Sequence, residues 1–236
     1  MKTDTAVSFI KSITNAEIER YTRYLGGIIP VSNEDLFRRW MFAYASVHTT
    51  WKLNCKMYQA LATLDWRGDY AELLTRIKES GAGLHNNRAR YIFEFSSFFW
   101  DHPAWFWKNQ HEGWAEYRDR IQEVTAGIGR AKSSFVTEMA YPKTAEVICT
   151  DTHVMQLYGS KRDSIGAGRV SDKDEKAMET HWVAECKASS VAPALARWIF
   201  WDRKQGYSDS RYWSFVFEPE NVHNMFRAKA LTINTL

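Results

Sequence analysis

Residues 125–159 read TAGIGRAKSSFVTEMAYPKTAEVICTDTHVMQLYG, and this stretch carries most of the information about the fold. Gly127-Ile128-Gly129 separates two helical patterns, and the second helix is predicted to begin at Arg130. Two glycines around one apolar residue allow a tight turn that brings the backbone close to a ligand. The N–H groups that open the following helix can then hold a phosphate. Taken alone, Gly-x-Gly is more often an ordinary turn between helices.

The same stretch ends in Asp151-Thr152-His153-Val154, and Asp151 falls at the N-cap of a helix predicted over 152–158. A plain helix cap is a sufficient explanation for an aspartate at this position, because Asp is one of the favoured N-cap residues. The combination of the Gly-x-Gly turn with this aspartate makes the stretch informative about function.

Helical patterns fill the rest of the chain. Capping pairs such as Thr14 with Glu17 predict where helices start. Neither an Asn-Gly hairpin nor a sustained period-two strand occurs, so the predicted class is all-α. The other start signals are Ser32, Asp69 with Glu72, and Ser171 with Asp174, and further helices are expected over 51–61, 88–100, 112–124, 130–140 and 191–204.

Composition limits the class of protein. The 236 residues contain no run of 18 apolar residues, so no membrane span is expected, and the first residues do not resemble a secretory signal. The net charge is only +3, so a nucleic-acid surface would require local clustering of Lys and Arg. The three cysteines are far apart, which predicts free thiols and no iron–sulfur cluster. We expect a cytoplasmic protein, at the nucleoid or in a phage-infected cell.

Three motifs carry a resemblance to a known family. The segments GIGRAKSSF (127–135) and VICTDTHVMQLYG (147–159) resemble the hairpin and aspartate motifs of the endonuclease III and 8-oxoguanine glycosylase families, which are helix-hairpin-helix (HhH-GPD) DNA glycosylases. The segment GLHNNRA (83–89) resembles the "GLYNxKA" loop of endonuclease III relatives. The resemblance covers roughly residues 32–160, and the remaining C-terminal residues match only in helical character.

The resemblance implies a two-lobed orthogonal helical bundle with the helix-hairpin-helix motif at a DNA cleft between the lobes. Residues 31–147 would form a six-helix lobe that includes the hairpin. Residues 1–30 and 148–236 would form the second lobe, which carries the catalytic aspartate.

The resemblance also implies roles for single residues. Asp151 would be the catalytic carboxylate, because cleavage of an N-glycosidic bond builds positive charge on the sugar. Leu84 would wedge into the duplex as the target nucleotide leaves the stack, although a core leucine is the alternative. His153 could approach the phosphate or the flipped nucleotide, or could simply be a surface histidine. The implied DNA-binding residues are Gly127, Gly129, Arg130, Lys132, Leu84, His85, Asn86 and His153, and the hairpin carbonyls could hold a monovalent cation.

The lysine of bifunctional relatives is displaced in this sequence. Those relatives place a Schiff-base lysine where this chain has Ala131, and Lys132 comes one position later, about 100° further round a helix. An extra residue in the hairpin would restore Lys132 as a catalytic residue. The plainer alignment leaves Lys132 as a phosphate contact or a solvated charge and predicts a monofunctional enzyme.

Several further residues are candidates for recognition. Ser46-Val47-His48-Thr49-Thr50-Trp51 aligns loosely with the family's "SQQT" segment, so Ser46, His48 and Trp51 are candidates for the base pocket. Core packing or a stacking platform would explain the aromatic residues Trp100, Trp105, Phe106 and Trp107. Phosphate contacts or a solvated face would explain the basic residues Arg88, Arg90, Arg118, Arg120, Arg130, Lys132, Lys161 and Arg162.

Taken together, the sequence predicts a DNA base-excision glycosylase that acts as a monomer on double-stranded DNA with a modified base. It would need no cofactor, no side-chain metal ligands and no membrane. One alternative is a phage-type hypermodification transferase of the same superfamily, in which an amine or amino acid displaces pyrophosphate from an activated hydroxymethyl pyrimidine. The second alternative is a catalytically silent DNA-binding module. The scattered histidines argue against a zinc site, and no Gly-x-Ser-x-Gly elbow is present.

Overall fold

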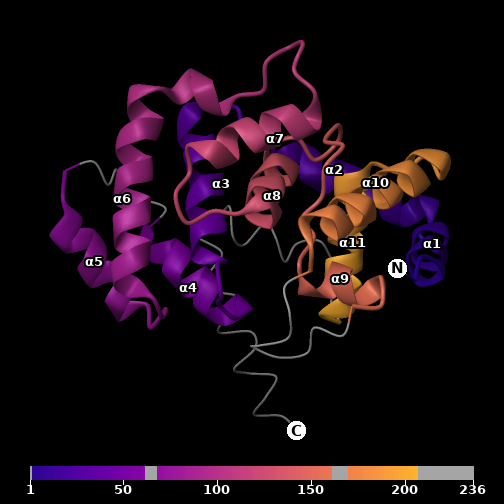
Figure 1. Ribbon diagram of the computed structural model, residues 1–236, viewed down its shortest axis with the longest axis horizontal. Coiled ribbons are helices and arrows are strands. Elements are labelled where there is room, and N and C mark those ends of the chain that lie inside the picture. The colour runs from indigo at the N-terminus through magenta and orange to yellow at the C-terminus, as the bar shows by residue number, and fades with distance from the viewer. Residues whose placement is uncertain (1, 62–67, 161–169, 207–236) are drawn as a thin grey trace, which may run out of the picture. The chain divides into compact units, whose positions relative to one another are not determined.

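A computed structural model describes residues 2–61, 68–160 and 170–206, and every regular element in these ranges is helical (Figure 1). This confirms the predicted all-α class. The elements are α1 (Asp4–Lys11), α2 (Asn15–Gly27), α3 (Asn33–Ala45), α4 (Trp51–Leu61), α5 (Tyr70–Glu79), α6 (His85–Asp101), η1 (Pro103–Phe106), α7 (Trp114–Glu123), α8 (Arg130–Ala140), α9 (Thr152–Leu157), α10 (Asp172–Ala188) and α11 (Pro193–Lys204).

The predicted helix starts are confirmed by the caps. Thr14 and Glu17 form a reciprocal capping box at α2. The Ser32, Asp69 and Ser171 side chains accept hydrogen bonds from the backbone at the starts of α3, α5 and α10. Helix α1 was not predicted, because its N-cap Thr3 makes no side-chain capping bond.

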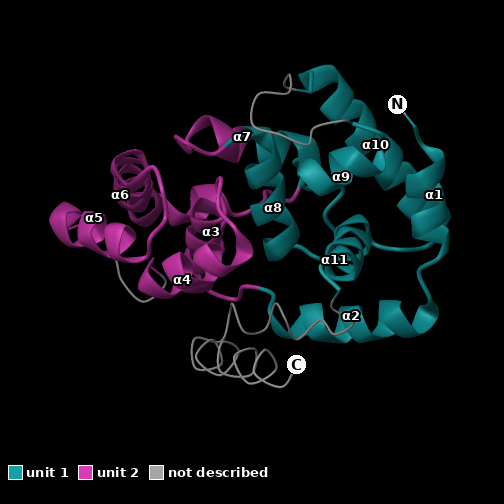
Figure 2. Cartoon of the chain, turned by 90° about the horizontal axis from the view of Figure 1, so that it is seen from below, with its two compact units in different colours: residues 1–29, 111–119, 129–210 teal, residues 30–110, 120–128, 211–236 magenta. Residues whose placement is uncertain are grey.

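The described residues divide into two compact units (Figure 2). Unit 1 comprises 2–29, 111–119, 129–160 and 170–206, and unit 2 comprises 30–61, 68–110 and 120–128. The predicted boundary after residue 147 differs from this division, because α8 belongs to the same unit as Asp151. The turn at Gly127 and the helix that follows Gly129 therefore lie in different units.

The core of unit 2 is aromatic. Trp40 and Phe37 on α3 face Phe95 on α6, with ring centroids 5.0 Å and 5.9 Å from that of Phe95. Phe106 closes the cluster from η1, 4.9 Å from Phe99, and is fully buried. Phe106 is therefore core packing and not part of a stacking platform.

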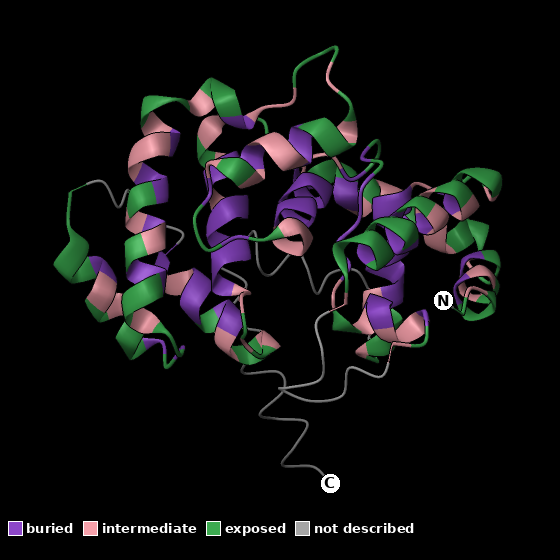
Figure 3. Cartoon of the chain, in the orientation of Figure 1, coloured by how far each residue is buried: buried purple, intermediate pink, exposed green. Residues whose placement is uncertain are grey.

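The core of unit 1 is built around α8 and α11. Every residue of α8 from Ser133 to Ala140 is buried, as the purple ribbon in Figure 3 shows. On α11, Phe200 packs edge-on against Phe9, whose ring lies 5.9 Å from Trp182 of α10. Three charged residues, Glu138 on α8 and Arg197 and Asp202 on α11, are buried within these apolar helices.

The side chains of Cys55, Cys149 and Cys186 are buried, and none of them forms a disulfide bond. Among the described helices, none combines the length and the apolar character required to span a membrane.

Candidate active site

The turn before α8 has two glycines with different backbone requirements. Gly127 has φ +79°, and a Cβ added there would lie 2.2 Å from Cδ2 of Tyr91. Gly129 is the N-cap of α8 with φ −99°, and a Cβ added to it meets no atom within 4 Å. Only Gly127 is therefore required by local geometry, whereas Gly129 leaves the start of α8 open. No side chain caps this helix start.

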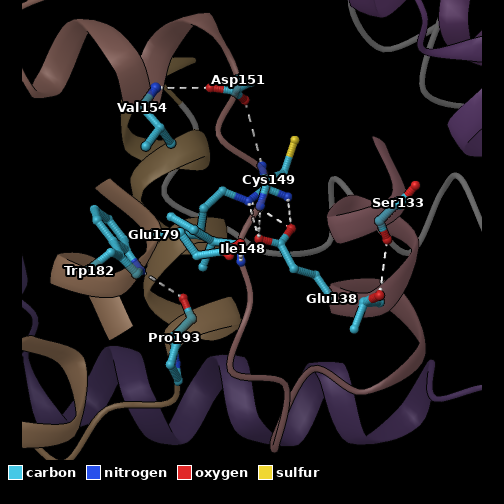
Figure 4. A network of polar contacts seen from close by, with 11 residues as sticks. Ser133, Glu138, Ile148, Cys149, Asp151, Val154, Glu179, Trp182 and Pro193 are labelled. Atoms are coloured by element: carbon cyan, nitrogen blue, oxygen red, sulfur yellow. Dashed lines mark hydrogen bonds and ion pairs between the residues drawn. The ribbon is translucent and has the colours of Figure 1, made fainter. Parts of the chain in front are cut away.

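Asp151 is the N-cap of α9, and its two carboxylate oxygens have different environments (Figure 4). Oδ1 accepts a hydrogen bond of 2.9 Å from the backbone N–H of Val154. Oδ2 lies 3.9 Å from Nη1 of Arg197. The side chain is 22% exposed, so it is partly desolvated and still reachable by a ligand. Asp151 thus caps α9 with Oδ1, and Oδ2 takes no part in the cap.

A buried ion pair lies behind Asp151. Arg197 on α11 donates to both oxygens of Glu138 on α8, at 2.5–3.1 Å, and Glu138 also accepts from the backbone N–H of Cys149 at 2.8 Å. Burial raises the pKa of Glu138 to about 6, although Arg197 acts in the opposite direction. Neither Glu138 nor Arg197 was predicted as part of the site. The sequence feature that could have indicated them is a charged residue on the apolar face of each helix.

Cys149 lies two positions before Asp151 but is unsuited to be a nucleophile. Burial raises the pKa of its thiol to about 12, against smaller lowering effects of Lys132 and Arg197. The thiol is therefore protonated at neutral pH and unreactive.

Lys132 lies on the same side of α8 as Phe135. Its Nζ is 5.3 Å from the Phe135 ring centroid, and the guanidinium of Arg197 is 5.2 Å from the same ring. Ala131, the preceding residue, occupies the position that the resemblance assigned to the Schiff-base lysine. The structure places the Lys132 ammonium in a cation–π contact with Phe135.

His153 and Arg130 are less open to solvent than expected for DNA contacts. The His153 ring packs 5.2 Å from the Trp201 ring. The Arg130 guanidinium lies 3.7 Å from carboxylate oxygens of Asp119 and Glu179, and its side chain is 15% exposed. Both residues are anchored by protein contacts within unit 1.

Leu84 has an unusual backbone conformation for a leucine and an exposed side chain. It is 57% exposed and precedes α6 with φ +58°, in the left-handed region that disfavours a leucine. The core alternative for Leu84 is wrong. His48 is also exposed and left-handed, with φ +47°.

Arg88 holds the segments that carry these two residues. Its Nε donates to the Gly83 carbonyl at 2.7 Å, Nη1 donates to the Tyr44 carbonyl at 2.9 Å, and Nη2 donates to the Val47 carbonyl. The residue is 5% exposed. The prediction that Arg88 contacts phosphate is therefore wrong, because its donors are used inside the protein.

The three predicted base-pocket residues differ in availability. The Ser46 hydroxyl donates to the Ala43 carbonyl of its own helix at 2.7 Å. Trp51 packs edge-on against Phe42 at 5.8 Å. His48 is the one exposed member of the trio, and Asn86, which is exposed, and His85, which is half-buried, belong to the same unit.

The remaining basic candidates are mostly occupied. Arg118 is 1% exposed and pairs with Glu179 at 2.6 Å, so its predicted phosphate contact is wrong. Arg120 donates to the Trp105 and Trp107 carbonyls, and Arg90 stacks on Tyr91 at 4.8 Å. Lys161 and Arg162 lie outside the described residues.

Solved structures with a similar fold include three of 8-oxoguanine DNA glycosylases. The 8-oxoguanine DNA glycosylase of Methanocaldococcus jannaschii aligns with a TM-score of 0.64 and 17% identity, over 84% of this chain and 88% of that chain. The 8-oxoguanine DNA glycosylase of Thermotoga maritima has a TM-score of 0.62 and 17% identity, over 88% and 94%. The M. jannaschii 8-oxoguanine glycosylase/lyase in complex with a 15mer DNA containing 8-oxoguanine has a TM-score of 0.62 and 18% identity, over 85% and 97%. No protein-family model and no curated protein sequence matches this chain.

The described helices thus define an all-helical fold of the type seen in these solved structures. More particularly, the chain has the helical fold of the 8-oxoguanine DNA glycosylases, at a sequence identity that establishes the fold alone.

Proposed function

We propose that this protein is a monofunctional DNA glycosylase that excises a modified base. The observation that supports this most strongly is Asp151, which caps α9 through one oxygen and leaves the second oxygen beside Arg197 in a partly exposed position. An aspartate needed only as a cap does not require a buried cation beside it. On a fold shared with DNA glycosylases, this carboxylate is the group best suited to act at the sugar.

The reaction follows from the charge of Asp151. The bond between the sugar C1′ and the base nitrogen breaks, and its electron pair leaves with the base, which takes up a proton. The ionised carboxylate of Asp151 stabilises the positive charge that develops at C1′. A water molecule adds its oxygen to C1′ and loses a proton to solvent or to Asp151, which leaves an abasic site and a free base.

A strand-cleavage assay tests this function. Duplexes that carry single modified bases are incubated with the protein and then treated with hot alkali, which breaks DNA at abasic sites. We expect cleavage at one or more modified positions and none in unmodified duplex. Binding of these duplexes without any abasic site would favour the catalytically silent DNA-binding module.

Leu84→Gly tests the proposed wedge. A left-handed non-glycine residue costs about 1 kcal/mol or more, so glycine should leave the free energy of unfolding unchanged or higher. Turnover on fully paired duplexes should fall, and turnover on mismatched duplexes should fall less because their stack is already open. Equal slowing on both kinds of duplex would contradict a wedge. Leu84→Ala, which keeps the left-handed strain, is the matched control for stability.

Replacing the two hairpin glycines singly tests phosphate binding. Gly127→Ala should destabilise the fold, because its Cβ would collide with Tyr91. Gly129→Ala should fold normally yet bind all DNA sequences more weakly, with the salt slope reduced by about 0.9 for each phosphate that the protein no longer neutralises. An unchanged slope in Gly129→Ala would show that the start of α8 does not bind the DNA backbone.

Borohydride trapping tests the monofunctional assignment. A lysine that attacks C1′ forms an imine, which borohydride reduces to a permanent protein–DNA link. Because Lys132 lies over Phe135 and Ala131 occupies the family position, we expect no trapped complex and modestly weaker DNA binding in Lys132→Ala. Efficient trapping that disappears in Lys132→Ala would instead establish Lys132 as a Schiff-base nucleophile.

Two further expectations belong to this proposal. A monovalent cation at the hairpin is compatible with the Ala126 carbonyl, because this oxygen accepts one bond from Tyr44 and has a second lone pair.

The hypermodification transferase is the second candidate function. It is favoured because Ala131 stands where bifunctional relatives have a lysine, and because the segment around His48 lacks the family's glutamines. It would leave the altered base attached to DNA, and would therefore produce no abasic sites.

A further inference from the structure

Two buried carboxylates hold consecutive backbone N–H groups in the segment that leads to Asp151. Glu138 accepts from Cys149 at 2.8 Å, and Glu179 accepts from Ile148 at 3.1 Å. Each carboxylate is paired with a buried arginine, Glu138 with Arg197 and Glu179 with Arg118. Figure 4 shows Glu138 and Glu179 with this segment. Both pairs lie in the same unit, and Glu179 also has the Arg130 guanidinium 3.7 Å away.

The two pairs differ in what the arginine contacts besides its glutamate. Arg197 uses Nε and Nη2 for Glu138, and its Nη1 lies 3.9 Å from Oδ2 of Asp151. Arg118 instead directs its Nε to Asp119, 2.8 Å away. Of these two arginines, only Arg197 has a guanidinium nitrogen close to the candidate catalytic carboxylate.

A contribution to stability alone does not explain why Arg197 is buried. Its side chain is 2% exposed and that of Glu138 is 0% exposed, and apolar residues of similar volume often serve a fold equally well at such positions. Two charges that cost desolvation energy are thus placed directly behind a partly exposed aspartate.

The charge balance suits a cationic transition state. The Glu138 carboxylate neutralises Arg197, so the three groups together keep one net negative charge when Asp151 is ionised. Arg197 can therefore orient the Asp151 oxygen without cancelling the field that Asp151 presents to the sugar.

We propose that Arg197 is a positioning residue for Asp151. Glu138 fixes the guanidinium, and Nη1 fixes the rotamer of the Asp151 carboxylate, whose other oxygen is held by Val154 N–H. This inference rests on the proposed function only for its catalytic consequence.

Arg197→Lys tests the proposal, because lysine keeps the charge opposite Glu138 and removes the second arm. With enzyme in excess over DNA, we expect the single-turnover rate of base release to fall about 100-fold, the scale of a displacement of 1 Å at a catalytic group. DNA affinity should be little changed. Arg118→Lys is the matched control, and its rate should stay close to that of the native protein. A native rate in Arg197→Lys, or an equal loss in both variants, would overturn the proposal.

A second measurement needs no turnover. The carboxyl ¹³C resonance of Asp151, assigned by its absence in Asp151→Asn, should shift in Arg197→Lys and stay in place in Arg118→Lys. If the native protein releases no base, the proposed function fails, while this resonance still decides whether Arg197 positions Asp151. An unchanged resonance in Arg197→Lys would overturn the positioning role. If Arg197→Lys does not fold, Arg197→Met/Glu138→Gln removes both charges of the pair and should show the same shift and the same loss of rate.

Discussion

Asp151→Asn is expected to slow base release strongly while the protein remains folded and bound to DNA. The asparagine oxygen can still accept from the Val154 N–H, so the α9 cap is retained. The negative charge is removed, and with it the stabilisation of the cationic sugar. We expect the single-turnover rate to fall by about 1,000-fold, which is the upper range for the loss of one electrostatic group at a reacting centre.

Asp69→Asn is the matched control for this experiment. Asp69 caps α5 in the same way, with its side chain accepting from Glu72 N–H at 2.8 Å, and it lies in the other unit. The same substitution at this cap should leave the rate unchanged. If Asp151→Asn kept near-native rates as well, Asp151 would be only a helix cap.

Arg88→Met is expected to lower both the stability of the protein and its turnover of DNA. The substitution keeps the buried volume of the side-chain stem and removes the donors to Gly83, Tyr44 and Val47. Because the three carbonyls lose the hydrogen bonds that a buried charged donor supplies, the free energy of unfolding should fall by about 2–4 kcal/mol. Because the same bonds hold the segments of Leu84 and His48, turnover on paired DNA should fall as well.

Urea denaturation measures the effect on stability. Arg90→Met is the control, since Arg90 lies on the exposed side of the same helix and stacks on Tyr91. Its unfolding midpoint should lie close to the native value. Arg88→Lys should have an intermediate unfolding midpoint, because one ammonium group cannot donate to three carbonyls with the geometry of a guanidinium. An unchanged midpoint in Arg88→Met would show that Arg88 does not hold these segments.

The features predicted correctly from the sequence are local. Thr14 with Glu17, and Ser32, mark helix starts because the capping bonds connect residues three positions apart. Gly127 could be placed at a turn because its left-handed backbone requires glycine. The N-cap position of Asp151 could be predicted because its capping bond reaches Val154, three positions later, whereas its catalytic role stays a prediction.

The features that were missed depend on partners distant in sequence. Arg88 looked like a phosphate contact, but two of its three acceptors lie 41 and 44 positions earlier in the chain. Glu138 and Arg197 are 59 positions apart, and neither has a local pattern that signals a pair. A charged residue within an apolar helical stretch was the visible sign in both cases. Charge type alone does not distinguish a buried pair from a solvated side chain.

Mass spectrometry of the products from duplexes with a panel of modified bases, 8-oxoguanine among them, tests the central claim most directly. The method identifies both the released small molecules and the nucleosides that remain in the strand. We predict a free modified base and an abasic strand with the native protein, and neither product with Asp151→Asn. A strand in which every base is retained, or one that gains an amine as pyrophosphate appears, would contradict base excision.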